Sequence, residues 1–237
     1  MKILVAGASG VVGRRLVPLL LARGHAVSGL ARSAAAVAAV EALGARPARA
    51  DVFDAAALRA ALRQAEPEVV IHQLTALSDA LADLPGALAA NARIRVEGTH
   101  NLVEAALAAG ARRMVAQSIA WVYADGPLPH GEDDALAAPA DGPGRVTIDG
   151  VRALEGMVLG TPGLEGVVLR YGQFYGPGTY GALPRGAVSV HVDAAAQAAV
   201  LALTAAPGAY NIADDGGSAS NAKARAALGW DPAFRAA

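Results

Sequence analysis

Cysteine is absent from this 237-residue sequence, which excludes disulfides, thiol nucleophiles and thiolate metal sites. The five histidines follow no metal-ligand spacing, so we predict no metal site. The formal net charge is only −1 and there is no basic tract, which argues against a nucleic-acid partner. No run of about 18 apolar residues is free of charge or glycine, so we expect no membrane-spanning segment.

Apolar side chains are plentiful, at 54% of the sequence, and many of them are alanine, which favours helices. The length suits one large domain, or one domain with a small appendage. The N-terminus lacks the basic, apolar and small-residue order of a secretory signal. We therefore expect a cytoplasmic protein with a substantial core.

The first thirteen residues carry the strongest functional signal. Residues 2–6 form a short aliphatic run suited to a buried strand, and helical spacing begins at 14–22. Between them lie Gly7, Gly10 and Gly13, spaced G-x-x-G-x-x-G where the common dehydrogenase fingerprint has G-x-G-x-x-G. We predict a dinucleotide site, the alternative being a plain strand-to-helix turn: one glycine allows a tight turn, one the close approach of the pyrophosphate, and one the packing of the helix on the strand. The helix N-terminus then offers N–H groups to the anion. The predicted cofactor contacts of this turn are Gly7, Ser9, Gly10, Val11, Val12 and Gly13.

The end of the second predicted strand, at 26–31, indicates which dinucleotide binds. An acidic residue at this point takes the ribose 2′-hydroxyl of NAD, whereas a nearby arginine accommodates the 2′-phosphate of NADP. Here Arg32 and Ser33 follow the strand and the acidic residue is missing. We predict that NADPH is preferred over NADH, the alternative being that Arg32 is an ordinary solvated side chain.

Further strand ends are expected to meet the cofactor. A third strand at 46–50 ends at Asp51 and Val52, while Asp54 is placed to cap a helix at 55–65. The next strand, 69–76, ends in Leu74, Thr75 and Ala76, and His72 within it is expected in the core. A strand at 112–118 brings Gln117 and Ser118 to the same edge.

The remaining pattern predicts an α/β fold of Rossmann type, with a doubly wound parallel sheet. Residues 1–170 form the dinucleotide-binding domain, and residues 171–237 form a small substrate-binding portion interleaved with it. The other predicted segments are helices at 34–43, 84–109 and 146–159, a long loop at 124–144, a strand at 166–170, a glycine-rich loop at 171–178, strands at 188–192 and 208–213, and helices at 194–205 and 221–228.

Several different short motifs are distributed along nearly the whole chain. They are G-A-S-G-V-V-G at 7–13, Asp51, V-E-G-T-H-N-L at 96–102, W-V-Y at 121–123, L-R at 169–170, Y-G-P-G at 175–178, H-V-D at 191–193, Y-N at 210–211 and L-G-W-D-P at 228–232. Together they resemble the extended short-chain dehydrogenase/reductases of the NAD-dependent epimerase/dehydratase type. The resemblance implies a Rossmann fold, a bound nicotinamide dinucleotide and a small-molecule substrate. It also implies that a homodimer forms through the helices at 84–109 and 146–159.

The catalytic pattern departs from that family, which uses a tyrosine as general acid/base and a lysine four residues later. Alignment of the helix implies that Ile148 stands at the tyrosine position and Arg152 at the lysine position. The third member, a serine or threonine, falls on Ile119, with Ser118 next to it, and Arg95 replaces a common asparagine. Since isoleucine cannot exchange a proton, the usual mechanism is unavailable at these positions.

Three functions remain open on the sequence alone. The protein is an oxidoreductase with displaced chemistry, a non-redox isomerase, cyclase or lyase that uses the dinucleotide structurally, or a non-catalytic NADP sensor. For the first, the candidate catalytic residues are Ser118, Tyr123 and Arg152, and Tyr171 is a further cofactor contact. The proton would come from Ser118, Tyr123, Tyr171, water or the substrate. Arg152 would hold the nicotinamide ribose and stabilise an oxyanion, but it cannot act as a base because a guanidinium keeps its proton in proteins.

Overall fold

The computed structural model describes residues 1–76, 84–138 and 143–236. Its centre is a seven-stranded parallel sheet with the order β3-β2-β1-β4-β5-β6-β9. The strands are β1 (Lys2–Ala6), β2 (Ala26–Ala31), β3 (Arg46–Arg49), β4 (Val69–His72), β5 (Arg113–Ile119), β6 (Glu165–Tyr171) and β9 (Gly208–Ile212). The predicted Rossmann-type fold is confirmed.

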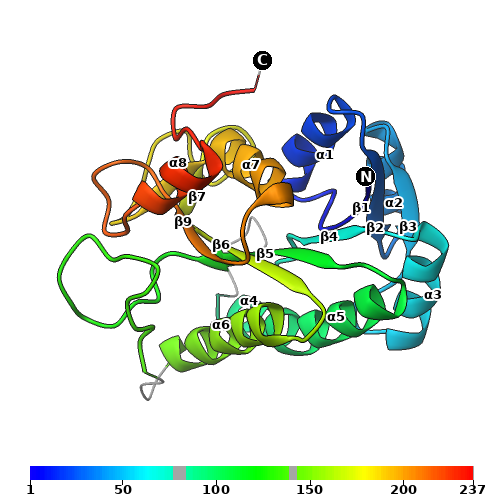
Figure 1. Ribbon diagram of the computed structural model, residues 1–237, viewed down its shortest axis with the longest axis horizontal. Coiled ribbons are helices and arrows are strands. Elements are labelled where there is room, and N and C mark those ends of the chain that lie inside the picture. The colour runs from blue at the N-terminus through cyan, green and yellow to red at the C-terminus, as the bar shows by residue number, and fades with distance from the viewer. Residues whose placement is uncertain (77–83, 139–142, 237) are drawn as a thin grey trace.

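Helices cover both faces of the sheet (Figure 1). One face carries α1 (Gly13–Leu21), α2 (Ala34–Ala42) and α7 (Val192–Leu201), with α8 (Ala222–Leu228) beyond them. The other carries α3 (Ala55–Ala65), α5 (Thr99–Ala108) and α6 (Pro143–Gly160), with α4 (Leu84–Arg93) packed beside α6. Among the described helices, none is long and apolar enough to cross a membrane.

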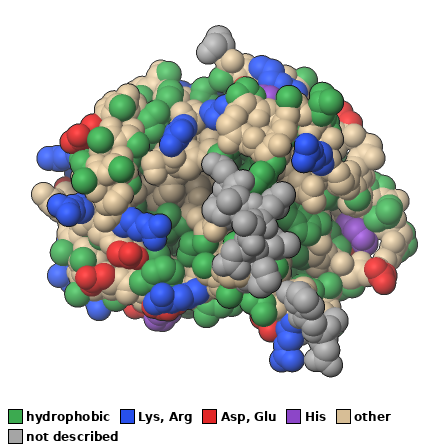
Figure 2. Space-filling view, turned by 180° about the vertical axis from the view of Figure 1, so that it is seen from behind, with side chains coloured by type: hydrophobic (Ala, Val, Ile, Leu, Met, Phe, Trp, Pro, Cys, Tyr) green, Lys and Arg blue, Asp and Glu red, His purple; other side chains and the backbone are tan. Residues whose placement is uncertain are grey.

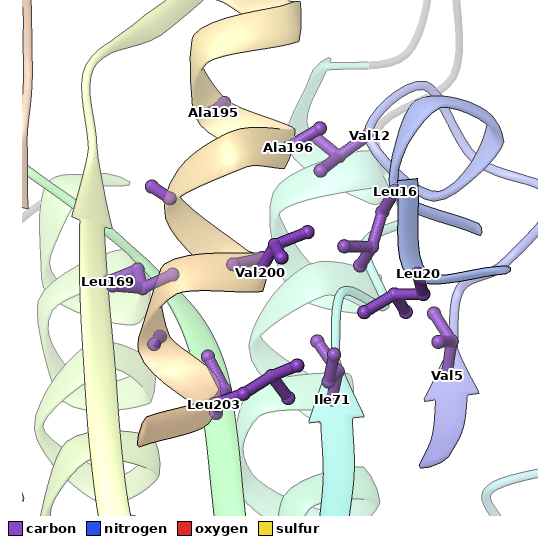
Figure 3. Close-up of a cluster of buried hydrophobic side chains, with 14 of the residues drawn as sticks. Val5, Val12, Leu16, Leu20, Ile71, Leu169, Ala195, Ala196, Val200 and Leu203 are labelled. Carbon is purple, nitrogen blue, oxygen red and sulfur yellow. The ribbon is translucent and has the colours of Figure 1, made fainter. Parts of the chain in front are cut away.

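The larger core cluster lies where α1 and α7 pack together on the sheet (Figure 3). Leu16 and Leu20 of α1 are fully buried and face Val200 of α7. Val5 and Ile71 rise from β1 and β4 beneath them. Each such side chain contributes about 1.5–3 kcal/mol by leaving water, so this layer fixes α1, and therefore its N-terminus, on the sheet.

The strand order reverses beside β1, because β2 and β3 lie to one side of it and β4, β5 and β6 to the other. In open parallel sheets, ligands bind beyond the carboxyl ends of the strands at such a reversal. The fold therefore points to the ends of β1 and β4 as the ligand edge. The glycine turn follows β1 directly.

Two segments differ from the sequence expectation. The helix expected over 84–109 is interrupted by a π-helix, η2 (Ile94–Gly98), which widens one turn between α4 and α5. The loop expected over 171–178 contains β7 (Gln173–Tyr175), which pairs with β8 (Ser189–His191) in a separate two-stranded sheet. By contrast, β9 joins the large sheet next to β6, and η3 (Ala202–Thr204) extends α7.

One arginine ties the glycine turn to the later part of the chain. Arg15, in the first turn of α1, donates from Nε to Asp193 of α7 over 2.7 Å, and it also bonds the carbonyl oxygens of Val11 and Pro177. Asp193 in turn accepts a bond from the backbone N–H of Ala236. The cofactor turn, the loop after β7, α7 and the last described residues thus meet at one guanidinium.

On the face seen in Figure 2, acidic and basic side chains are interspersed among apolar ones. This mixture of signs fits the net charge of −1. Among the described residues there is also no group of three or more His, Asp or Glu side chains that could hold a metal ion.

Candidate functional site

A side chain at each of the three glycines after β1 would meet different surroundings. Gly7 has φ +94°, and a Cβ there would lie 2.6 Å from the carbonyl oxygen of Gln73. A Cβ on Gly13 would overlap the carbonyl oxygens of Gly7 and Ala8. Gly10 donates to the Gly7 carbonyl over 3.0 Å, yet its Cβ would meet only that oxygen, at 3.2 Å, and the residue is exposed. The turn is closed on its inner side and open above Gly10.

The open side of this turn presents hydrogen-bond donors. Arg14 closes the turn, since its backbone N–H bonds the Gly10 carbonyl over 2.9 Å and its Nε bonds the Ser9 carbonyl over 2.7 Å. Within the described part of the chain, the N–H groups of Val11 and Val12 make no hydrogen bond. Free N–H groups at a helix N-terminus bind anions, so the cradle fits a pyrophosphate.

Arg32 and Ser33 lie at the next strand end, as the sequence predicts. Arg32 is exposed and makes no hydrogen bond to any described residue. The Ser33 hydroxyl accepts a bond from the N–H of Ala36 over 3.2 Å and so caps α2, which leaves its own proton free to donate. A free guanidinium, a hydroxyl and a helix N-terminus together suit a phosphate group.

Asp51 and Val52 follow β3 at the same edge. The Asp51 carboxylate accepts a bond from the N–H of Phe53 over 2.9 Å, which leaves its second oxygen available. Val52 is buried, and its carbonyl oxygen accepts a bond from Asn101 of α5 over 3.0 Å. These two hydrogen bonds hold Asp51 and Val52 in place at this edge of the sheet.

The segment after β4 is held by its neighbours. Leu74 donates its N–H to Nδ1 of His72 over 3.3 Å, and Ala76 donates to the side chain of Asn91 over 3.2 Å, while Thr75 is exposed. His72 lies in the core, as expected, with Nε2 3.1 Å from the Thr99 hydroxyl. Burial lowers the pKa of His72 to about 4, so this ring is neutral at pH 7.

Ser118, a predicted catalytic residue, belongs to a buried charged group. Its hydroxyl donates to Oε1 of Glu155 over 2.6 Å. Arg170 of β6 grips the same carboxylate with two bonds, Nε to Oε1 at 3.1 Å and a terminal nitrogen to Oε2 at 2.7 Å. All three residues are at least nine-tenths buried. Ser118 thus holds a carboxylate at the end of β5.

Tyr123, another predicted catalytic residue, joins this group from the other side. Its hydroxyl donates to Oδ1 of Asn211 over 2.6 Å and accepts a bond from Arg170 over 2.9 Å. Burial raises the pKa of Tyr123. The backbone N–H of Asn211 in β9 is bonded by the Glu132 carboxylate over 2.7 Å. The tyrosine is therefore braced between β6, β9 and the loop after β5.

Two predicted cofactor contacts, Gln117 in β5 and Tyr171 in β6, have different surroundings. Gln117 is half-buried, opposite Leu169 in the sheet, and remains a prediction. Tyr171 is fully buried, its hydroxyl donates to the Ala195 carbonyl over 3.2 Å, and its own carbonyl accepts from Ala120 over 2.9 Å. The ring of Tyr171 thus lies in the core, and its contact with the cofactor remains a prediction.

Arg152, the third predicted catalytic residue, lies on α6. Its side chain is exposed and bonds the carbonyl oxygens of Leu136 and Ala137 in the loop before α6. The side chain that packs against Ile119 is Val151, one residue earlier, and successive helical residues point about 100° apart. In this structure Arg152 therefore holds the loop before α6, and its contact with the nicotinamide ribose remains a prediction. Ile148 is half-buried.

Glu155, Arg170 and Asn211 are the site residues that sequence reasoning did not nominate. The signal for Arg170 was present, because a charged residue ends an otherwise apolar strand, and such a residue needs a buried partner. Which acid it meets depends on how α6 packs, and no local pattern states that.

Comparisons with known proteins show the family to which this chain belongs. Residues 3–197 match the NAD dependent epimerase/dehydratase family. A 3-diazoavenalumate denitrifying reductase from Streptomyces sp. is 46% identical over 237 residues, which covers 91% of this chain and 76% of that protein. The dTDP-4-dehydrorhamnose reductase of Streptomyces griseus is 31% identical over 260 residues, which covers 97% of this chain and 77% of that protein.

Solved structures give the same fold. The UDP-glucose 4-epimerase of Thermus thermophilus, in complex with NAD, superposes with a TM-score of 0.74 at 25% sequence identity. The match covers 98% of this chain and 85% of the epimerase. The fold of this chain is therefore shared by a protein whose solved structure contains NAD.

Proposed function

Because this chain belongs to the NAD-dependent epimerase/dehydratase family, we propose that it is an NADP(H)-dependent oxidoreductase that reduces a small molecule without a side-chain proton donor. The observation that carries this proposal is that the candidate hydroxyl groups already donate their protons to acceptors within the protein. Ser118 donates to Glu155, Tyr123 to Asn211 and Tyr171 to Ala195.

Among the described residues, the three candidate hydroxyls are thus already engaged as donors, which limits the chemistry. Reduction of a carbonyl leaves an alkoxide that must gain a proton, and a positioned acid normally supplies it. Burial raises the pKa of Tyr123, which makes it a weaker acid, and Ile119 and Val151 turn apolar side chains toward one another at the end of β5. A substrate that needs only a hydride suits this site better than a ketone.

An aryl diazonium ion is such a substrate, and the diazo compound in the name of the 46% identical relative supports this class. In its reduction a hydride forms the new carbon–hydrogen bond, the carbon–nitrogen bond breaks, and the electron pair of that bond leaves with dinitrogen. Charge balances without a proton. The dinitrogen leaves as a gas, so the step is effectively irreversible.

The residues of the chain divide the remaining tasks. The N–H groups of Val11 and Val12 would hold the pyrophosphate, and Arg32 with Ser33 would hold the 2′-phosphate. When bound, a reduced nicotinamide supplies the hydride. Positioning of the substrate beside it accounts for the catalysis, and positioning alone is worth as much as about 7–11 kcal/mol.

Isotope transfer tests the reaction class. With NADPH deuterated at C4 and an aryl diazonium that carries a carboxylate, we expect an arene with deuterium at the carbon that lost nitrogen. An unlabelled altered product would mean non-redox chemistry, and binding without turnover would mean a sensor. Rapid reduction of simple ketones would also contradict the proposal, because those substrates need the missing acid.

The cofactor preference has its own test. We expect Arg32→Ala to weaken NADPH binding about 10–100-fold, because a charge-assisted bond to phosphate contributes about 1.5–3 kcal/mol. NADH binding should hardly change, since NADH has no 2′-phosphate. Isothermal titration of both cofactors measures this, with Arg63→Ala on α3 as an exposed control. Equal affinity of the unaltered protein for NADPH and NADH would end the proposal.

We also propose that the protein forms a homodimer through α4 and α6. These helices pack side by side, and Val96, Val146 and Leu159 on and beside them are exposed large apolar residues. Exposed apolar groups on adjacent helices are typical of an interface.

A further inference from the structure

Arg95 is a buried cation that has no hydrogen-bond partner among the residues that the structure describes. It lies in the π-helix η2 and is only 8% exposed. No acceptor among the described residues bonds its guanidinium, although other buried arginines, such as Arg170, are fully bonded. Its side chain runs against α6, where a Cβ on Gly150 would lie 3.3 Å from the Arg95 Cδ.

The charges around Arg95 do not balance. Glu155 is close enough to favour the charged guanidinium, but both of its oxygens are already bonded by Arg170 and one by Ser118. His72 also faces this space and is neutral at pH 7, because burial lowers its pKa to about 4. Two arginines thus share one carboxylate, which leaves one uncompensated positive charge.

The guanidinium of Arg95 keeps its positive charge although burial disfavours it, and solvent can reach it. Burial lowers the pKa of Arg95 to about 10, so the side chain remains protonated at pH 7 although its surroundings disfavour the charge. None of its nitrogen atoms is among the fully enclosed polar atoms without a partner, so the guanidinium borders space that solvent enters. A buried unpaired charge is destabilising, which points to a ligand as its partner.

We propose that Arg95 binds the carboxylate of an aromatic substrate at the ends of β4 and β5. This inference rests on the proposed function, since it names a feature of the substrate reduced there. The guanidinium fork matches a carboxylate with two parallel bonds. The single uncompensated charge matches a monoanion, whereas a phosphate carries about −1.5 to −2 at pH 7.

The surroundings favour an aromatic group on that carboxylate. Val151 follows Gly150 directly on α6, and it packs with Ile119 and Val122 at the end of β5. Ile119 follows Ser118 directly in β5, so this apolar cluster lies next to the residue that bonds Glu155. A flat ring with one carboxylate places its charge at Arg95 and its apolar part along this wall.

Benzoate and benzamide, which have nearly the same shape but differ in charge, test the inference by equilibrium binding. We expect the protein saturated with NADP⁺ to bind benzoate at least about tenfold more tightly than benzamide, which corresponds to about 1.4 kcal/mol. Arg95→Met should abolish the preference, and Arg95→Lys should restore part of it. Arg93→Met, two residues earlier and exposed in an ion pair with Glu97, should leave it unchanged.

A structural role for Arg95 would give a different result. We expect Arg95→Met to keep or raise the midpoint of urea unfolding, because it removes an unpaired buried charge. A lowered midpoint with an intact benzoate preference would overturn the inference. Equal binding of benzoate and benzamide by the unaltered protein, or displacement of benzoate by equimolar inorganic phosphate, would overturn it too. Because binding needs no turnover, benzoate selectivity without hydride transfer would refute the proposed function alone.

Discussion

Glu155→Leu is expected to lower the free energy of unfolding by about 3–5 kcal/mol, because it leaves Arg170 charged and buried without its partner. The two side chains are 6% and 7% exposed and are joined by two hydrogen bonds. Chemical denaturation at pH 7, followed by circular dichroism, measures the loss. Ser118 would lose its acceptor in the same variant.

Two controls show whether charge burial is the cause. Glu165→Gln removes an acid that pairs with Arg113 but is 58% exposed, and a loss of no more than about 1 kcal/mol is expected. The double variant Glu155→Leu with Arg170→Met should be more stable than Glu155→Leu alone, since both charges are then gone. A single variant that loses less than about 1 kcal/mol would show that Arg170 finds another partner.

Gly13→Ala and Gly10→Ala should separate folding from cofactor binding. A methyl group at Gly13 would overlap the carbonyl oxygens of Gly7 and Ala8, and backbone atoms cannot give way without moving the turn. We expect a loss of about 3 kcal/mol or more in the free energy of unfolding, the upper end of overpacking effects.

At Gly10 the same methyl group meets only the Gly7 carbonyl, at 3.2 Å, so stability should fall by less than about 1 kcal/mol. The methyl group instead covers the open side of the turn, where the pyrophosphate approaches. We expect NADPH to bind at least about tenfold more weakly, by isothermal titration. Undiminished binding by Gly10→Ala would place the pyrophosphate elsewhere.

The sequence predicted the sheet well because the signals there are local. The spans of β1 and β2 coincide with the predicted strands, and the helix capped by Asp54 begins at Ala55 as expected. Buried parallel strands and side-chain caps are determined by residues that are close together in the sequence. The position of Gly7, Gly10 and Gly13 at the carboxyl end of β1 follows from the same local pattern.

The interior of the site was harder to predict because it depends on packing between distant segments. Ser118, Glu155 and Arg170 come from three elements, and only the packed fold brings their side chains together. Arg152 shows how sensitive such reasoning is, since one residue of helical register separates a side chain that faces the sheet from one that faces the loop. The π-turn around Arg95 breaks a helix that the pattern extends without interruption.

The bonds of Arg15 have a consequence for biosynthesis. Its partners at Pro177 and Asp193 lie more than 160 residues later in the chain. A ribosome that adds roughly 5–20 residues per second makes them about ten to forty seconds after Arg15 itself. The glycine turn is synthesised before α7, so the Arg15 guanidinium on its helix lacks its partner Asp193 until α7 has been made. In a nascent chain, the bonds that fix the glycine turn through Arg15 are therefore complete only after residue 193 has been made.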